Sequence, residues 1–204
     1  MEKSSVLFMA HKQVFNSHKV SKKSFINQFF KENKMVGSMI PSSRFLATKM
    51  LKNIPFDQAK VIVELGPGTG IFTEKIMKRL NPDTHLVVIE LNDVFYQNLA
   101  AKTKQENCHI VHGSASDLDK ILSDLGLGQA DCVVSSLPLS NFPKELRVSI
   151  MQAVLHCLTP TGTFIQFQYT LQSKKHFKSL FRNISIDYAA FNFPPAFVYT
   201  CSNS

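Results

Sequence analysis

The 204-residue sequence lacks the features of membrane-spanning, secreted and metal-binding chains. No apolar run approaches the roughly 18 residues needed to cross a bilayer, and the short apolar stretch 6–10 has neither the length nor the cleavage site of a signal peptide. Its four cysteines form no C-x-x-C pair, and its seven histidines show no ligand spacing such as H-E-x-x-H. The length suits one α/β domain with a sizeable core. The absences predict buried thiols in the reducing cytoplasm and no metal site.

Acidic side chains are scarce at the start of the chain. Residues 1–52 contain ten basic and two acidic side chains, a difference that accounts for the whole formal charge of +8. The rest of the chain carries thirteen of each and is neutral. A neutral body with a basic arm predicts a polyanionic partner, either an anionic membrane surface or a nucleic acid.

The basic arm also contains an amphipathic pattern. Over residues 21–39, Phe25, Ile26, Phe29 and Phe30 fall on one side of a predicted helix, and lysines fill much of the other. Aromatic residues opposite lysines are typical of a helix that lies in a membrane interface. The same stripe also fits packing on the protein's own core.

A turn joins this arm to the body of the chain. Its two serines, Ser42 and Ser43, fit the N-cap of a helix over 44–51, and they also fit a lid that folds over a cofactor. We therefore divide the chain into a basic N-terminal helical segment, 1–55, for membrane docking or a lid, and a catalytic domain, 56–204.

The central stretch of the sequence is residues 61–70, V-I-V-E-L-G-P-G-T-G. Three branched apolar residues predict a buried strand, and the glycine-rich turn leads into a helix at about Ile71. A strand, a glycine turn and a helix form the usual cradle for a nucleotide-like cofactor. The third glycine of a dinucleotide fingerprint is expected where Ile71 stands, whereas Gly70 comes one residue early.

Acidic residues near the turn favour a positively charged cofactor. Glu64 ends the strand and Glu74 lies in the first helical turn, where two acids would repel a pyrophosphate. They suit the ammonium and sulfonium of S-adenosyl-L-methionine. Glu90, twenty residues after Gly70, ends a second predicted strand and can accept hydrogen bonds from both ribose hydroxyls. A purely structural turn with an incidental surface acid is the alternative.

The remaining sequence alternates strands with helices and ends on two strands. A loop after the fourth strand contains Leu137, Pro138 and Asn141, at the edge where open α/β sheets bind ligands. A turn is predicted over 159–162. The predicted strands cover 61–64, 85–90, 108–112, 131–136, 163–169, 184–191 and 196–201, and the predicted helices cover 71 onward, 93–104, the stretch to 125, 144–158 and 173–182.

The glycine run with Glu90 resembles the motifs of class I S-adenosylmethionine-dependent methyltransferases over residues 58–204. The loop 135–143, S-S-L-P-L-S-N-F-P, is similar to loops in two narrower families: ribosomal RNA adenine dimethyltransferases and bacterial phospholipid N-methyltransferases that act on phosphatidylethanolamine. Segments 36–44, 166–169 and 192–199 also resemble the lipid-modifying family. This resemblance implies a Rossmann-like fold with a mixed seven-stranded sheet flanked by helices, and a membrane-docking N-terminal helix.

Two departures bear on the substrate and the cofactor. The RNA enzymes place an aromatic residue after the loop proline to stack on the target adenine, but here Leu139 has no π face. The chain also ends too soon after its last strand for their C-terminal RNA-binding domain. Ser114 stands where many relatives have an aspartate that reaches the adenine amine, which affects the expected adenine contacts.

The resemblance implies an enzyme that transfers methyl groups to phosphatidylethanolamine, with no nucleic-acid partner and a location on the inner face of the membrane. RNA methylation is the alternative, and a non-enzymatic membrane- or RNA-binding module is a third reading. The expected substrate-orienting residues are Tyr169, Leu137, Pro138 and Asn141. The expected cofactor-binding residues, with the glycine amides beneath the methionine portion, are Ser42, Ser43, Glu64, Gly66, Gly68, Thr69, Gly70, Glu90, Leu91, Ser114, Ala115 and Ser135.

Overall fold

The computed structural model describes residues 44–204. The predicted helix over 21–39, its membrane-docking role, and Ser42 and Ser43 lie outside these residues. The predicted domain boundary at residue 55 stays a prediction. Helix α2 (Arg44–Lys52) precedes this boundary in the sequence, but it packs on the sheet through Leu46, Ala47 and Met50.

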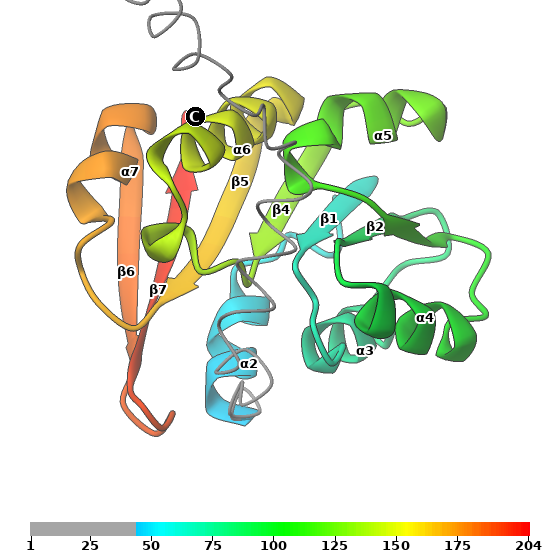
Figure 1. Ribbon diagram of the computed structural model, residues 1–204, viewed down its shortest axis with the longest axis horizontal. Coiled ribbons are helices and arrows are strands. Elements are labelled where there is room, and N and C mark those ends of the chain that lie inside the picture. Colours follow the sequence, from blue (N-terminus) through cyan, green and yellow to red (C-terminus); the bar gives the residue numbers. More distant parts are fainter. Residues whose placement is uncertain (1–43) are drawn as a thin grey trace, which may run out of the picture.

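The described chain is a three-layer α/β/α sandwich (Figure 1). Its seven-stranded mixed sheet confirms the predicted fold, with the strand order β3-β2-β1-β4-β5-β7-β6. All neighbours pair in parallel except β7, which is antiparallel to both β5 and β6. The strands are β1 (Val61–Leu65), β2 (His85–Glu90), β3 (Cys108–His112), β4 (Ala130–Ser135), β5 (Leu158–Gln168), β6 (Asn183–Ala189) and β7 (Ala196–Ser202).

Helices cover both faces of the sheet because the central strands are apolar on both sides. Val61, Val63 and Leu65 belong to one buried cluster, and Ile62 belongs to the cluster on the opposite face. Figure 1 shows α5, α6 and α7 on one side of the sheet and α2, α3 and α4 on the other. These helices are α3 (Ile71–Met77), α4 (Asp93–Lys102), α5 (Leu118–Asp124), α6 (Lys144–Cys157) and α7 (Lys174–Leu180).

The sequence-based boundaries were wrong in two places. Strand β5 begins at Leu158 and not at 163, and the turn predicted over 159–162 forms an irregularity inside it. Leu158 pairs with Ala130 and Thr163 with Cys132, so five residues along β5 match two along β4. The chain folds back there, since a Cβ at Gly162 would lie 3.0 Å from the Thr159 amide nitrogen. A Cβ at Gly162 would lie 3.0 Å from the Ala130 carbonyl oxygen, which explains the glycine there. The strand predicted over 184–191 ends at Ala189, where a hairpin turn begins.

All four cysteines are buried free thiols, as the sequence predicts. Within residues 44–204 no helix has both the length and the apolar character needed to span a bilayer. The same residues contain no cluster of three or more histidine, cysteine or acidic side chains that would suit a metal ion.

Candidate active site

The cofactor cradle forms where the strand order reverses. The chain proceeds from β1 to β2 and β3 in one direction and then returns to β4 on the other side of β1. Ligands bind at this point of an open α/β sheet, outside the carboxyl ends of the strands. The loop between β1 and α3 and the loop after β4 meet there, since the Ser136 amide donates to the Leu65 carbonyl at 2.9 Å.

Three glycines give the β1–α3 loop its shape. Gly66, Gly68 and Gly70 all have positive φ, at 68°, 56° and 84°, which side-chain-bearing residues adopt only with strain. Their amides are used within the protein: Gly66 donates to the Ile89 carbonyl, Gly68 to the Glu90 carboxylate and Gly70 to the Pro67 carbonyl. The glycines therefore shape the cradle, while their amides hold the loop together.

The loop is also packed too tightly for side chains. A Cβ on Gly66 would lie 2.5 Å from Leu137 Cδ2, and one on Gly70 would lie 2.4 Å from Leu99 Cδ2. Leu137 belongs to the loop after β4, so the glycine loop and the expected substrate loop are in direct contact. Thr69, between the glycines, is exposed on the outside of the turn.

Gly66→Ala and Gly126→Ala form a matched pair that separates strain from collision. Both glycines have nearly the same φ, 68° and 67°, but nothing lies within 4 Å of a Cβ at Gly126. We expect each variant to lose about 1–2 kcal/mol of unfolding free energy from the left-handed backbone. Gly66→Ala alone should also weaken cofactor binding, because its methyl group displaces Leu137. Urea unfolding and titration calorimetry measure the two effects; equal cofactor affinity in both variants would contradict the role given to the Gly66–Leu137 contact.

Glu90 ties the glycine loop to the start of α4. Its carboxylate accepts hydrogen bonds from the Gly68 amide at 3.1 Å and the Asn92 amide at 2.8 Å, one on each oxygen. Burial raises the pKa of Glu90, and these amides oppose the rise. Each oxygen keeps acceptor capacity beyond the bond that it makes. The geometry therefore suits the predicted contact with two ribose hydroxyls.

Glu64 is a fully buried acid with no hydrogen-bond partner for either carboxylate oxygen. Desolvation raises its pKa from the ordinary 4.5 to about 8. The hydroxyl and amide of Thr73 oppose that rise, although neither forms a hydrogen bond of normal geometry with the carboxylate, and Glu90 adds to it. An unpartnered buried carboxylate is costly unless a cation accompanies it. This orphaned group fits a positively charged cofactor and gives no support to a dinucleotide.

The residues expected near the adenine follow β3 at the same edge of the sheet. Leu91 is partly buried after β2, and the Gly113 amide donates to the Glu90 carbonyl at 3.0 Å. Ser114 is next to it, but its hydroxyl lies 2.8 Å from the Ser116 hydroxyl and accepts from the Ser116 amide, so it already has local partners. Ala115 is buried in a 3-10 turn.

The loop after β4 is held by a glutamine that was not predicted as a site residue, although it lies in the segment 166–169 that resembles the lipid-modifying family. The Leu137 carbonyl accepts two hydrogen bonds, from the Leu139 amide at 2.8 Å and from Gln166 Nε2 at 3.0 Å. The Pro138 carbonyl accepts one hydrogen bond within the described residues, from the Asn141 amide at 2.9 Å. Of the two expected carbonyls, Pro138 is thus the one with capacity for a substrate. The Ser135 hydroxyl accepts from the Leu137 amide at 3.3 Å.

Two glutamines on β5 complete this loop. Gln166 is fully buried and Gln168 nearly so, and Ser140 donates to Gln168 Oε1 at 3.0 Å. The oxygen of Gln166 and the amide nitrogen of Gln168 have no hydrogen-bond partner. Alternation of glutamine with apolar residues is also typical of a strand with one exposed face, so the burial of both glutamines could not be predicted from it. The available signal was two polar side chains at the carboxyl end of a central strand.

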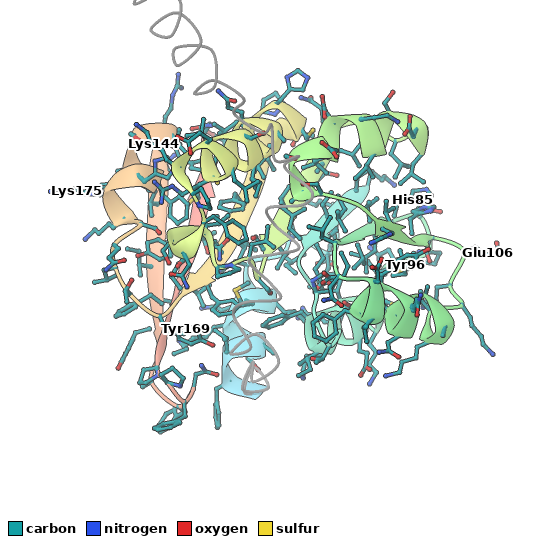
Figure 2. The ribbon with its side chains drawn as sticks, viewed as in Figure 1. His85, Tyr96, Glu106, Lys144, Tyr169 and Lys175 are labelled. Atoms are coloured by element: carbon teal, nitrogen blue, oxygen red, sulfur yellow. The ribbon has the colours of Figure 1, made fainter. Side chains whose placement is uncertain are left out.

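Tyr169 follows the end of β5 and remains 46% exposed. Its ring packs edge-on against Phe167 at 5.7 Å. Partial burial raises the pKa of the phenol, so Tyr169 is a neutral hydrogen-bonding group at physiological pH. Asn141 is exposed on the loop beyond Pro138, and its Oδ1 lies 3.2 Å from the Ser140 hydroxyl oxygen. Figure 2 shows Tyr169 beside the β6–β7 hairpin.

Comparison with known proteins agrees with this arrangement. Residues 13–159 match the family model described as ribosomal RNA adenine dimethylase. The chain is 36% identical over 179 residues to an ornithine lipid N-methyltransferase from Singulisphaera acidiphila, covering 87% of this chain and 93% of that protein.

Solved structures with low sequence identity share the fold. The O-methyltransferase TomG from Streptomyces achromogenes, determined in complex with S-adenosylmethionine, has a TM-score of 0.62 at 16% identity and covers 97% of this chain and 95% of its own. A precorrin-6y C5,15-methyltransferase from Geobacter metallireducens has a TM-score of 0.59 at 16% identity, with coverage of 78% and 88%.

Proposed function

The chain belongs to the ribosomal RNA adenine dimethylase family of S-adenosylmethionine-dependent methyltransferases, and we propose that it methylates the primary amine of a membrane lipid. Its cofactor is S-adenosyl-L-methionine. The observation that carries the choice of substrate is the 36% identity to an ornithine lipid N-methyltransferase across nearly the whole of both chains. Phosphatidylethanolamine, the lipid suggested by the sequence motifs, also carries a primary amine in its headgroup.

The site supports a lipid amine over an adenine. Leu139, at the position where the RNA enzymes carry a stacking aromatic residue, is 1% exposed and belongs to the hydrophobic core. A buried aliphatic side chain offers no surface on which a base can stack. The basic residues at 1–52 would attract an anionic membrane as strongly as RNA, so they do not favour RNA.

The protein's contribution is to bind, orient and exclude water. The bound cofactor supplies a methyl group already activated as a sulfonium. Transfer would form a nitrogen–carbon bond at the expense of the donor's sulfur–carbon bond, so the chain's own residues need only hold the amine neutral, place it in line with the methyl group and let its surplus proton leave through the open side of the site. A neutral amine is needed, and desolvation beside the loop after β4 lowers an amine pKa.

Groups on the loop after β4 and at the end of β5 orient the amine. The Pro138 carbonyl and the neutral Tyr169 phenol accept hydrogen bonds from its N–H groups. Gln166 fixes the loop through the Leu137 carbonyl, and Asn141 borders the same loop. Positioning of this kind accounts for a large share of catalysis when the donor is already activated. We place the enzyme as a peripheral protein on the cytoplasmic face of the membrane.

Transfer of a radiolabelled methyl group separates the substrate classes. The full chain is incubated with labelled S-adenosylmethionine and, in separate arms, vesicles with ornithine lipid, vesicles with phosphatidylethanolamine, and ribosomal RNA. We expect label in a lipid arm, with the more heavily labelled headgroup naming the substrate, and none in RNA. Labelled RNA with unlabelled lipids would overturn the proposal and leave the cofactor assignment intact.

A further inference from the structure

One edge of the molecule exposes an unusual number of large apolar side chains. Phe191 and Phe193 are 79% and 82% exposed, and Phe45 is 57% exposed. Tyr169 and Leu171 are each close to half exposed. We call these five side chains the aromatic rim. An exposed apolar cluster of this kind marks a contact surface for a protein or a membrane.

The rim is a built feature, because a buried polar side chain shapes its tip. Asn192, between the two most exposed phenylalanines, is only 4% exposed and donates from its side chain to the Pro194 carbonyl at 2.7 Å. Its amide donates to the Ala189 carbonyl at 3.2 Å. The turn is thus held from inside while Phe191 and Phe193 project outward. The Phe45 ring of α2 packs on Phe191 with centroids 5.3 Å apart.

The rim lies at the same edge of the sheet as the proposed substrate loop. Ala189 at the end of β6 pairs with Ala196 at the start of β7, and Phe197 of β7 pairs with Gln168 at the end of β5. The hairpin tip therefore extends beyond the carboxyl end of β5, where Tyr169 and the glutamines lie. Figure 1 shows the tip beside α2, and Figure 2 shows Tyr169 near both.

We propose that the aromatic rim inserts into the interface of an anionic bilayer and brings the substrate loop to the lipid headgroups. The inference rests on the proposed function for its choice of a membrane as the occupant. Aromatic side chains prefer the level of the headgroups. The chain also carries a positive charge that complements an anionic bilayer: residues 1–43, directly before α2 in the sequence, contain seven lysines and two glutamates. Together the rim and these lysines supply the two kinds of contact that peripheral membrane binding uses.

The absence of tryptophan from the chain permits a direct test. Phe193→Trp places the only tryptophan of the full-length protein at the tip of the rim. Vesicles of phosphatidylglycerol and phosphatidylcholine, with or without bromine atoms on the acyl chains, are then added. We expect a blue shift of the emission and quenching by the brominated lipid. The matched control is Gln105→Trp, on the exposed turn before β3 at the opposite edge of the sheet, whose emission should stay unchanged.

A second variant measures the contribution of the rim to binding. Phe191→Ser/Phe193→Ser should weaken vesicle association by about tenfold for each side chain removed from the interface. Its affinity for S-adenosylmethionine should match the wild type, which shows that the fold is retained.

Three results would overturn the proposal. One is unchanged emission of Phe193→Trp with vesicles that the enzyme does methylate. Another is emission that is already blue and shielded from iodide without vesicles, which would show that residues 1–43 cover the rim. The third is shielding that grows with protein concentration, which would indicate a second copy. Insertion without lipid methylation would support the rim and count against the proposed substrate, so the two failures are distinguishable.

Discussion

Glu90→Ala is expected to weaken the binding of S-adenosylmethionine by about 100-fold or more, beyond detection in titration calorimetry. The carboxylate holds the Gly68 and Asn92 amides at 3.1 and 2.8 Å, and we expect it to accept from the ribose as well. Hydrogen bonds to a charged group contribute roughly 1.5–3 kcal/mol each, and about 1.4 kcal/mol is a factor of ten in affinity. Loss of two such contacts therefore gives the stated effect.

A cofactor analogue separates ribose recognition from loop shaping. Wild-type protein should bind 2′-deoxy-S-adenosylhomocysteine about tenfold more weakly than S-adenosylhomocysteine, since one charged hydrogen bond is lost. Glu90→Gln should bind both alike. If that variant kept the wild-type preference, the ribose role of Glu90 would be refuted. Asp93→Asn, which removes an exposed acid from the first turn of α4, is the charge-matched control and should bind normally.

Glu64→Gln is expected to make the cofactor-free protein more stable and the cofactor bind less tightly. The folded-state pKa of Glu64 is about 8, against an ordinary 4.5. Between these values the folded state keeps a proton that the unfolded state has released, so this group lowers stability as the pH rises through the window. The full difference is about 5 kcal/mol. Urea unfolding of wild type and variant from about pH 5 to pH 8 should show the variant gaining stability relative to the wild type.

The affinity for the cofactor should rise with pH, whereas the stability of the cofactor-free protein should fall. Only the ionised carboxylate attracts a cation, so wild-type affinity should rise by roughly tenfold per unit below the pKa, as measured between about pH 5.5 and pH 7. Glu64→Gln should show no such rise. Glu74, which was predicted to act with Glu64, is exposed on the first turn of α3, where water screens its charge. Glu74→Gln is therefore the matched control and should keep the wild-type pH dependence. A wild-type affinity that is flat over this range would contradict the role of Glu64.

Sequence periodicity was sufficient to predict most of the fold. Apolar runs such as 61–63 and 86–89 predict buried parallel strands, and the glycine run predicts the cofactor edge, because both depend on local chemistry. The start of β5 was predicted too late, at 163, because Leu158 pairs with Ala130 before the irregularity at 159–162 and extends the strand backward. The pairing of Leu158 with Ala130 cannot be predicted from residues 158–162 alone, because it depends on where β4 lies in the sheet.

The site was predicted only in part, because some of its contacts are local in the sequence and others join distant segments. Glu64, Glu90 and the glycines stand at fixed distances along one strand–turn–helix unit, so spacing alone singles them out. Gln166 gains its contact with the Leu137 carbonyl only when β5 lies beside β4. The aromatic rim joins Phe45 to Phe191 across most of the chain, and no local pattern predicts that contact.

The most direct test of the central claim is the fragmentation mass spectrum of a lipid product formed by the purified full-length chain with S-adenosylmethionine and vesicles. The account predicts one or more methyl groups on the headgroup nitrogen, with no product from Glu90→Ala. A methyl group on a carboxylate or hydroxyl oxygen, or vesicles left unmodified by a chain that binds its cofactor, would contradict it.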